Sequence, residues 1–311
     1  MSKNCDIMKR MKENYESRSR TFLTRRTPVI MRLDGKAFHT YTKHLVKPFD
    51  EGLIEDMAET ARFLCSEIQG AKLAYVQSDE ISILITDYDK LTTSAWFDYN
   101  VQKMTSISAS LASAKFNSLR LQRVFKEMGR LGRFNNPMLV DDPNAIGFVR
   151  DMYEVNINTQ DLAYFDSRVF NIPKEEVANY FLARQKDAVK NSIAMLAQSL
   201  YSHKELHKKN QSDMQEMCFQ KGQNWNDLHW SKKRGTTIIK KTYVGGEDIS
   251  QTDEVGEPVI TAFQEDGGTV YAKWCNDKGD WVDMEDQTKR TKWETVETPF
   301  VFHQSYFDVF M

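Results

Sequence analysis

The sequence has few cysteines and no long hydrophobic run. Its cysteines, Cys5, Cys65, Cys218 and Cys275, lie far apart, and no CxxC pair occurs. This spacing argues against a zinc site and predicts free thiols in a reducing compartment. No apolar run approaches the ~20 residues that cross a bilayer, and no signal peptide is in view. We therefore expect a soluble, cytoplasmic protein with no membrane partner.

Several common nucleotide-site and hydrolase motifs are also missing. The sequence contains no GxxxxGK[ST] phosphate loop, no GxGxxG, no GxSxG and no HExxH. It also lacks a strong net charge, which is −2 over 311 residues. A nucleic-acid partner would therefore have to be held by local basic patches. The hydrophobic fraction of 41% is that of an ordinary globular chain, and the length allows one large core or two domains.

The segment PVIMRLDGKAFHT, residues 28–40, is the most informative part of the chain. A short apolar run ends at Asp34 and Gly35, which is typical of a buried strand that carries a carboxylate to its end. Gly35 lets the backbone turn sharply and approach a ligand closely. The positive residues that follow, Lys36, His39, Lys43 and Lys47, could bind a triphosphate, although such a run is more often a solvated surface.

A second acid, Asp79, lies between two apolar runs, residues 71–77 and 81–86. These runs are so close that they predict a hairpin with Asp79 at its tip. Apolar residues at helical spacing predict a helix over residues 51–69, capped by Asp50. The order is therefore β-α-β-β, and we expect Asp34 and Asp79 to project from neighbouring strands at one end of a sheet.

Two carboxylates placed in this way suit phosphoryl or nucleotidyl transfer with two metal ions, which stabilise the attacking and leaving oxygens together. Mg²⁺ prefers oxygen ligands, so the backbone carbonyl of Gly35 could complete the set with Asp34 and Asp79. The alternative is that both acids only begin turns, where aspartate is common.

A long helix is predicted over residues 100–128. Basic residues follow one side of it or its continuation and could track a nucleic-acid backbone: Arg120, Arg123, Lys126, Arg130 and Arg133. A water-facing helix side explains the same spacing equally well. His203 and His207 are one turn apart without an evident third ligand, so a surface helix explains them better than a metal site.

We predict an α+β fold with an antiparallel sheet flanked by helices. Further strands are expected at residues 149–158 and 163–170, and a helix or helix pair at 173–201. A basic turn at residues 232–235 should precede a strand at 236–243. From residue 244 the composition shifts toward Gly, Asp, Glu and Thr, with short strands at 259–263, 269–275 and 280–284. The predicted domains are residues 1–243 and a β-rich C-terminal extension, residues 244–311.

An ordered set of segments then points to a known family. They are RLDGKAFH (residues 32–39), KPFDE (47–51), AYVQSDEIS (74–82), NVQKMTS (100–106), FDSRVF (165–170), RQKDAVKNSI (184–193), GQNWNDL (222–228) and KKRGT (232–236). Together they resemble the tRNA-His guanylyltransferase family, including its bacterial, archaeal and phage-type "like" members. The family's catalytic core is similar to the palm of ordinary polymerases, but it extends RNA in the 3′→5′ direction.

The resemblance implies a site and a reaction. Asp34, the Gly35 carbonyl and Asp79 would hold two Mg²⁺ ions, with Glu80 supporting them. The implied nucleotide-binding residues are Asp34, Gly35, Lys36, Ala37, Phe38, His39, Lys47, Asp50, Ser78, Asp79 and Lys103. ATP would activate the tRNA 5′-phosphate, and the 3′-hydroxyl of GTP would then attack it and expel AMP. Pyrophosphate is removed afterwards where the product requires it.

The tRNA partner would contact the basic residues of the long helix, which we call the basic row, and the helix that begins its motif at residues 184–187 (RQKD), which we call the RQ-x-D helix. The candidates are Arg120, Arg123, Lys126, Arg130, Arg184, Gln185, Asp187, Lys190 and Asn191. The resemblance also implies a homotetramer with tRNA reaching across subunits.

The sequence departs from eukaryotic members in two places. They carry His-Ile-Asn-Asn where this chain has Val189, Lys190, Asn191 and Ser192, and they carry Asn where it has Phe49. The chain is therefore more similar to the "like" members, which rebuild truncated tRNA 5′ ends by Watson–Crick pairing. Two rival hypotheses stay open: a palm-type nucleotide cyclase or signalling-nucleotide synthase, and an RNA-binding protein that has lost catalysis.

Overall fold

The computed structural model describes residues 3–130, 162–244, 247–248, 260–265, 269–275, 281–283 and 289–311. The predicted strand at residues 149–158 and Arg133 lie outside these ranges. The chain forms two compact units. One comprises Met1–Thr237 together with Val296–Met311, and the other is Ile238–Thr295. The first unit carries the acid pair and is described first.

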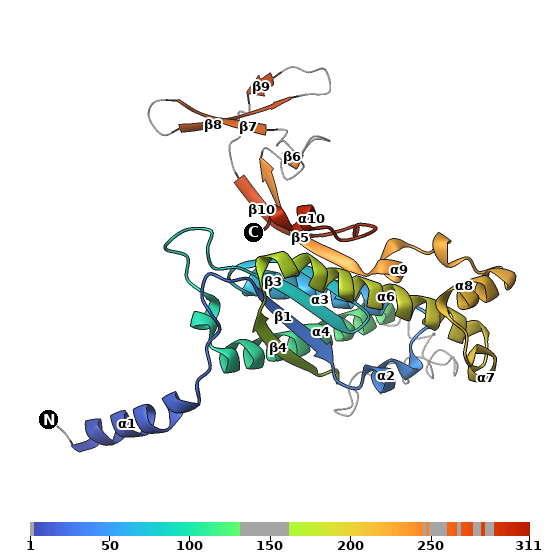
Figure 1. Ribbon diagram of the computed structural model, residues 1–311, viewed down its shortest axis with the longest axis horizontal. Helices are drawn as coiled ribbons and strands as arrows, with labels where there is room; N and C mark the ends of the chain where they lie inside the picture. The colour runs from blue at the N-terminus through green and yellow to red at the C-terminus, as the bar shows by residue number, and fades with distance from the viewer. Residues whose placement is uncertain are drawn as a thin grey trace. The chain divides into compact units, whose positions relative to one another are not determined.

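The sheet of the first unit is antiparallel, as predicted (Figure 1). Strands β1 (Val29–Gly35), β2 (Ala71–Gln77), β3 (Glu80–Ile85) and β4 (Phe165–Asn171) pair in the order β2-β3-β1-β4. β2 and β3 form the predicted hairpin, with Gln77 paired to Glu80. β1 lies beside β3 and runs antiparallel to it. The predicted β-α-β-β order is therefore confirmed.

The apolar runs of the sequence form the centre of the core. Every residue of β3 is buried, and so are Val29, Ile30, Met31 and Leu33 of β1. At the start of β1 and the end of β3 both faces are apolar, and helices cover both faces. Helices α3 (Glu51–Glu67) and α4 (Val101–Arg130) pack against each other and against the sheet, and α6 (Val177–Leu200) crosses the other face (Figure 1).

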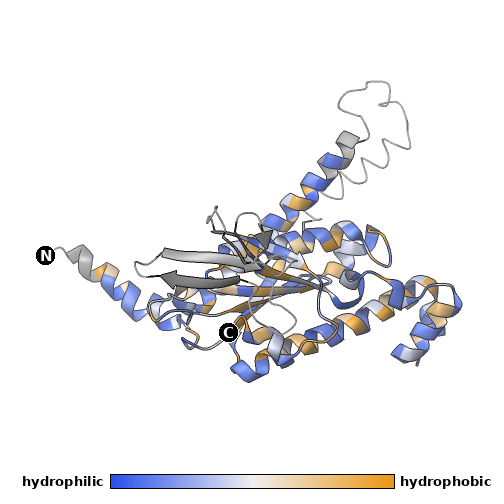
Figure 2. Ribbon diagram, turned by 90° about the horizontal axis from the view of Figure 1, so that it is seen from above, coloured by the Kyte–Doolittle hydropathy of each residue, from blue (hydrophilic) through white to orange (hydrophobic). Residues whose placement is uncertain are grey.

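Helix α3 begins where the sequence predicts. The Asp50 carboxylate accepts a hydrogen bond from the Leu53 backbone N–H at 2.7 Å, which satisfies one of the free donors at the helix start. Met57, Ala61 and Leu64 recur at helical spacing and are fully buried. Figure 2 shows this alternation of apolar and polar residues on the helices of the first unit.

The remaining helices of the first unit are short, apart from α1. They are α1 (Lys3–Asn14), α2 (Phe38–Tyr41), α7 (His203–Leu206), α8 (Gln211–Gln220), α9 (Trp230–Arg234) and α10 (Gln304–Asp308). The basic residues 232–234, predicted as a turn, instead form the end of α9. Gly235, with φ of 79°, ends that helix, and β5 (Thr236–Val244) follows it.

The last residues of the chain return to the first unit and pack on α6. The rings of Phe302 and Phe307 lie 6.1 and 5.0 Å from that of Phe181. The Gln185 side chain donates to the Pro299 carbonyl at 2.7 Å and accepts from the Phe302 N–H at 3.2 Å. Burial of these rings together with a satisfied amide fixes the C-terminal segment on the helix.

The second unit contains short strands, as expected from its composition. β7 (Ile260–Glu265), β8 (Thr269–Cys275) and β9 (Trp281–Asp283) form an antiparallel three-stranded sheet. β6 (Glu247–Asp248) pairs with β5, and β10 (Lys289–Val296) leads back to the first unit. In the described part of the chain, no helix combines the length and the apolar character that crossing a membrane demands.

Candidate active site

Asp34 and Asp79 lie at the same end of the sheet. Asp34 is the next-to-last residue of β1 and pairs with Glu80 across the strands. The Gly35 N–H donates to the Asp79 carbonyl at 3.1 Å. The structure therefore brings the two aspartates together from positions 45 residues apart in the sequence, as the strand order predicted.

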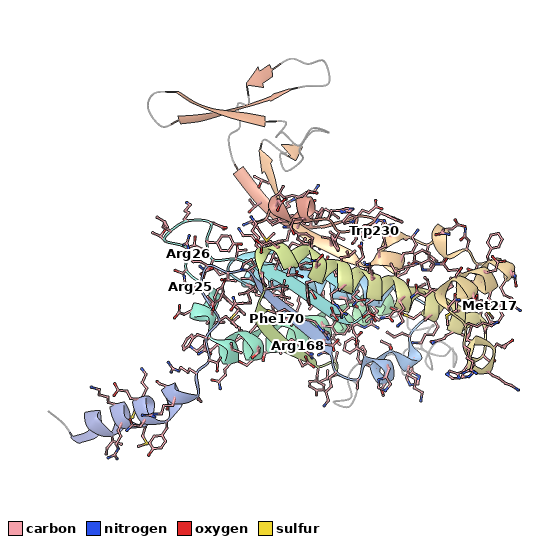
Figure 3. All side chains as sticks on the ribbon, viewed as in Figure 1. Arg25, Arg26, Arg168, Phe170, Met217 and Trp230 are labelled. Atoms are coloured by element: carbon pink, nitrogen blue, oxygen red, sulfur yellow. The ribbon has the colours of Figure 1, made fainter. Side chains whose placement is uncertain are left out.

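Charged side chains form two rows across one face of the sheet near this end. Asp34 pairs with Glu80 on one side and Asp166 on the other, while Arg32 pairs with Ser82 and Arg168. Directly paired residues of neighbouring strands share a face. Figure 3 shows Arg168 and Phe170 along β4.

The outer acids of this row have arginine partners. Glu80 accepts from Arg184 at 2.9 Å and lies 3.3 Å from Arg32, and Arg168 lies 2.9 Å from Asp166. For Asp34 the nearest ion-pair contact is looser, at 3.8 Å from Arg32. Glu80 is therefore a buried carboxylate that two arginines hold beside the acid pair.

The pKa of Asp79 is raised above its ordinary value. Burial is the main cause, and the negative charge of Asp34 adds to it, while hydrogen bonds from backbone and from Ser78 oppose it. Among the described residues Asp79 has no cationic partner in an ion pair. Two carboxylates that repel each other at a partly open sheet end are a suitable place for a cation.

The residues at this end fit a Mg²⁺ site of the kind that protein and substrate share. Among the residues that the structure describes, no cluster of three or more His, Cys, Asp or Glu could hold a metal. Mg²⁺, however, is commonly bound by one or two carboxylates together with water and substrate phosphates. Asp34 and Asp79 supply the carboxylates, and the Asp34 side chain is 36% exposed.

The loop after Asp34 is anchored by an aromatic cluster. The Phe38 ring packs against Tyr41, Phe116 and Phe165 with centroid distances of 5.0, 5.6 and 5.2 Å. Phe38 is only 4% exposed, so its side chain holds the loop in place. Ala37 has a left-handed conformation, with φ of 54°. Lys36 and His39 are exposed and, of the predicted loop residues, these two can reach a ligand with their side chains.

Gly35→Ala should disturb this loop. A Cβ at residue 35 would lie within 2.7 Å of Cγ of Phe38, and the ring cannot withdraw because three aromatic neighbours surround it. We expect a loss of about 1–3 kcal/mol in the free energy of unfolding, which thermal unfolding measures.

The companion variant is Phe38→Leu, which opens space next to residue 35. If the clash is the cause, the double variant loses less stability than the sum of the two single variants. Strict additivity would show that the glycine matters for another reason.

A pocket opens beside the hairpin tip. It is formed by the loop before α3, the end of β2, the middle of α6 and the segment around α9. Of the predicted nucleotide-binding residues, Lys47, Asp50 and Ser78 line it, and the predicted tRNA-binding residue Asn191 does so too. Ser78 is adjacent in sequence to Asp79, so the pocket lies beside the hairpin tip that carries one of the two acids.

Asp50 is not free to bind a ligand. Both of its carboxylate oxygens accept backbone N–H groups, from Leu53 at 2.7 Å and from Val46 at 3.3 Å. Its role is therefore to cap α3 and to shape the loop that carries Lys47. The Lys47 ammonium donates to the Thr42 carbonyl at 3.0 Å and is exposed, so it can turn to a phosphate.

Lys103, the third predicted triphosphate contact, lies at the opposite end of the sheet. Its ammonium is 5.8 Å from the ring centroid of Phe97, and the neighbouring Asp98 pairs with Arg25 at 3.1 Å. Arg25 precedes β1, so it lies at the end of that strand away from Asp34 (Figure 3). The structure does not bring Lys103 to the acid pair.

The basic row of α4 is not a free surface. Arg120 and Arg123 both bind the buried carboxylate of Asp56, at 3.0 and 2.7 Å. The Arg120 side chain is only 11% exposed. These two arginines therefore join α4 to α3, while Lys126 stays exposed. The side chain of Arg130 lies outside the described part.

The RQ-x-D helix also faces inward for the most part. Arg184 binds Glu80, and Gln185, 3% exposed, holds the C-terminal segment. Asp187 lies 3.4 Å from Arg184 and is 41% exposed. Lys190 and Asn191 are exposed. Helical periodicity could not separate the bound residues from the exposed ones, because Arg184 and Gln185 bind segments that are distant in the sequence.

Three polar residues near the acid pair were not among the sequence-based candidates: Arg32, Asp166 and Arg168. A signal was present, since Arg32 and Asp34, and likewise Asp166 and Arg168, are two residues apart. On a strand this spacing places both side chains on one face.

Comparisons with known proteins identify the family. A family model described as Thg1, tRNAHis guanylyltransferase, matches residues 8–173. The chain is 26% identical over 237 residues to a probable tRNA(His) guanylyltransferase of Drosophila melanogaster, covering 72% of this chain and 70% of that protein. It is 25% identical over 249 residues to the tRNA(His) guanylyltransferase of Debaryomyces hansenii, covering 75% and 82%.

Solved structures agree. A bacterial tRNA(His) guanylyltransferase (Thg1)-like protein in complex with GTP is 36% identical, with 98% of each chain covered and a TM-score of 0.63. A protein of the same description in complex with ATP is 46% identical, covering 75% of this chain and 88% of that chain, with a TM-score of 0.61. The Saccharomyces cerevisiae enzyme, 20% identical with a TM-score of 0.54 over 78% and 97% of the two chains, shares the fold.

The antiparallel sheet with helices on both faces is the fold of these relatives, and the matched family is one of nucleotidyltransferases. Because the family model covers more than half of the sequence, the chain belongs to the tRNAHis guanylyltransferase family.

Proposed function

We propose that this chain is a Mg²⁺-dependent nucleotidyltransferase that adds nucleotides to the 5′ end of tRNA. The observation that carries the proposal is the position of Asp34 and Asp79 beside a pocket that is lined by Ser78 and Lys47. The two carboxylates suit metal-assisted phosphoryl chemistry, and the pocket offers the space and positive charge that a nucleoside triphosphate requires. Two bacterial relatives are described in complex with ATP and with GTP.

The proposed reaction has two transfers. An oxygen of the tRNA 5′-phosphate attacks the α-phosphorus of ATP and releases pyrophosphate. The 3′-hydroxyl of GTP then attacks the activated 5′-phosphorus and releases AMP, and terminal pyrophosphate is removed where the product requires it. Two Mg²⁺ ions held by Asp34, the Gly35 carbonyl and Asp79 would lower the pKa of the attacking hydroxyl and neutralise phosphate charge.

The protein's own groups position the substrates. Lys47 and the exposed Lys36 and His39 offer positive charge to the triphosphate, and the Ser78 hydroxyl lies at the pocket wall next to Asp79. Glu80, fixed by two arginines, holds the hairpin tip. These groups keep the reacting atoms in place, which is a large part of catalysis in phosphoryl transfer.

Template-directed repair of truncated 5′ ends is the proposed activity of this member. It lacks the His-Ile-Asn-Asn segment of eukaryotic members, and Ser192 instead accepts from the Trp225 indole at 3.0 Å. The bacterial Thg1-like proteins are more similar to it than the two eukaryotic enzymes, at 46% and 36% against 26% and 25% identity. For tRNA contacts we propose Lys126, Lys190 and Asn191, and for the assembly a homotetramer, which mass photometry would test.

The decisive assay supplies 5′-phosphorylated tRNA, intact or lacking its first nucleotide, with ATP, labelled GTP and Mg²⁺. We expect the truncated tRNA to gain the nucleotide that restores pairing, and EDTA to stop the reaction. Absence of 5′ extension on every tRNA would contradict the proposal. A cyclase would instead convert GTP alone into a small-molecule product, which chromatography of the same mixture without tRNA would reveal.

A further inference from the structure

Gln77 places a carboxamide at the pocket beside the hairpin tip. It is the last residue of β2, it is only 7% exposed, and it lines the pocket beside the hairpin tip. Within the described part of the chain its side chain makes no hydrogen bond. Its amide atoms are not among the enclosed side-chain atoms that lack a partner, so the carboxamide is accessible and can form hydrogen bonds with a ligand.

The neighbours of Gln77 on its face of the sheet already have partners. Glu80, which pairs with it across the hairpin, is bound by Arg184 and Arg32. Tyr75, two residues earlier on the same face, donates its hydroxyl to the Arg234 carbonyl at 2.6 Å. These charges and hydroxyls are therefore satisfied without Gln77, which lines the pocket.

Other polar side chains of the pocket are also engaged. Lys232 pairs with Glu51 at 2.7 Å, and Lys233 donates to the Asn226 carbonyl at 2.5 Å. Asn191, on α6 across the pocket, is the exception: its exposed carboxamide has no side-chain hydrogen bond in the described structure. Besides Lys47 and Ser78, which are proposed to contact the triphosphate, the pocket therefore offers a ligand the carboxamides of Gln77 and Asn191, each with a donor and an acceptor side by side.

We propose that the Gln77 carboxamide binds the edge of the purine base of the bound nucleoside triphosphate and makes this pocket a purine site. An amide can match adenine, which presents a donor beside an acceptor, and it can turn to match an acceptor–donor edge of guanine. One residue therefore accounts for a pocket that accepts both purines. This inference rests on the proposed function, because it assumes that the pocket holds the nucleotide.

The test is a change in the ratio of the two purine affinities. Gln77→Glu replaces a donor and an acceptor by two acceptors. Guanine offers two adjacent N–H donors to a carboxylate, whereas adenine offers one donor with a lone pair beside it. We expect the ratio of GTP to ATP affinity to rise about tenfold, as measured by isothermal titration calorimetry of the full chain with Mg²⁺. Repulsion between the new carboxylate and the triphosphate is common to both ligands and cancels in the ratio.

Gln77→Met gives an independent measurement that does not introduce a charge. Methionine has a similar length but no hydrogen-bonding edge, so ATP and GTP should both bind about tenfold more weakly, with KM affected more than kcat. The matched control is Gln102→Glu, an exposed amide at the start of α4 without a side-chain hydrogen bond in the described structure. It should leave both affinities unchanged.

The outcomes separate this inference from the proposed function. If the unmodified chain binds neither ATP nor GTP, the proposed function itself fails. If it binds both and Gln77→Met keeps both affinities, Gln77 does not contact the base. The inference is also overturned if a folded Gln77→Glu variant, checked by circular dichroism, keeps the original affinity ratio. If that variant does not fold, Gln77→Met decides.

Discussion

Replacing Asp79 by asparagine is expected to slow 5′-end addition by about a thousandfold or more. Asparagine has nearly the same shape but cannot bring the negative charge that Mg²⁺ binding needs beside Asp34. The affinity for tRNA should change by no more than about twofold, because the residue lies at the reacting end and not on the exposed helix surfaces. Single-turnover addition with labelled GTP and a filter-binding titration of tRNA measure the two quantities.

Asp89→Asn is the matched control. Asp89 is an exposed acid, paired with Lys72 at 2.6 Å, and it should leave both turnover and binding unchanged. An Asp79→Asn variant that is folded and retains full activity would remove the acid pair from the mechanism. Loss of folding would show instead that Asp79 is structural.

The same substitution should make the fold slightly more stable when no divalent metal is present. Because burial and the charge of Asp34 raise the pKa of Asp79, the folded chain binds this proton more readily than the unfolded chain. The ionised carboxylate therefore destabilises the fold, and the penalty grows as the pH rises from the unfolded pKa to the folded pKa. At neutral pH we expect the Tm of the variant to be higher by about 2 °C. Added Mg²⁺ should raise the Tm of the unmodified chain only.

Asp56→Ala is expected to have the largest effect on stability, a loss of about 3–5 kcal/mol in the free energy of unfolding. The Asp56 side chain is 4% exposed and binds Arg120 at 3.0 Å and Arg123 at 2.7 Å. Its hydrogen bonds to Arg123, and then its charge, raise the pKa of that guanidinium. Alanine leaves two guanidinium groups without their shared partner between α3 and α4. Chemical denaturation should report the loss, and the Tm should fall by roughly 10 °C.

The neighbouring Glu55→Ala is the control. Glu55 also binds Arg123, at 3.0 Å, but its side chain is 67% exposed. Removing it should therefore change stability by less than about 1 kcal/mol. If Asp56→Ala keeps its stability while Arg120→Ala and Arg123→Ala specifically weaken tRNA binding, the basic row would be a nucleic-acid surface after all.

Local features of the sequence predicted the part of the fold that carries the acid pair. Helix α3 follows from its apolar spacing and from the Asp50 cap, and the hairpin follows from two apolar runs separated by a few polar residues. These signals act over a few residues, so a single sequence is sufficient to reveal them. Strand order then placed Asp34 near Asp79 without further information.

The sequence did not predict in the same way which group each charged or polar side chain binds within the fold. Arg120 has the spacing of a solvent-facing row, yet its guanidinium binds a carboxylate 64 residues away. Gln185 belongs to a segment that resembles a tRNA-binding motif, but its amide binds residues near the C-terminus. Lys103 follows the acids in sequence, but α4 begins at the other end of the sheet.

The sequence by itself determined the strand–helix–hairpin order and the carboxylates at one sheet end, because alternation, caps and tight turns are encoded by adjacent residues. Only the tertiary structure decided which charged groups are left for substrates. That outcome depends on which distant segment packs against each side chain. Asp56 binds two arginines and Glu80 binds Arg184. The uncharged Gln77 lines the pocket and makes no side-chain hydrogen bond in the described part of the chain.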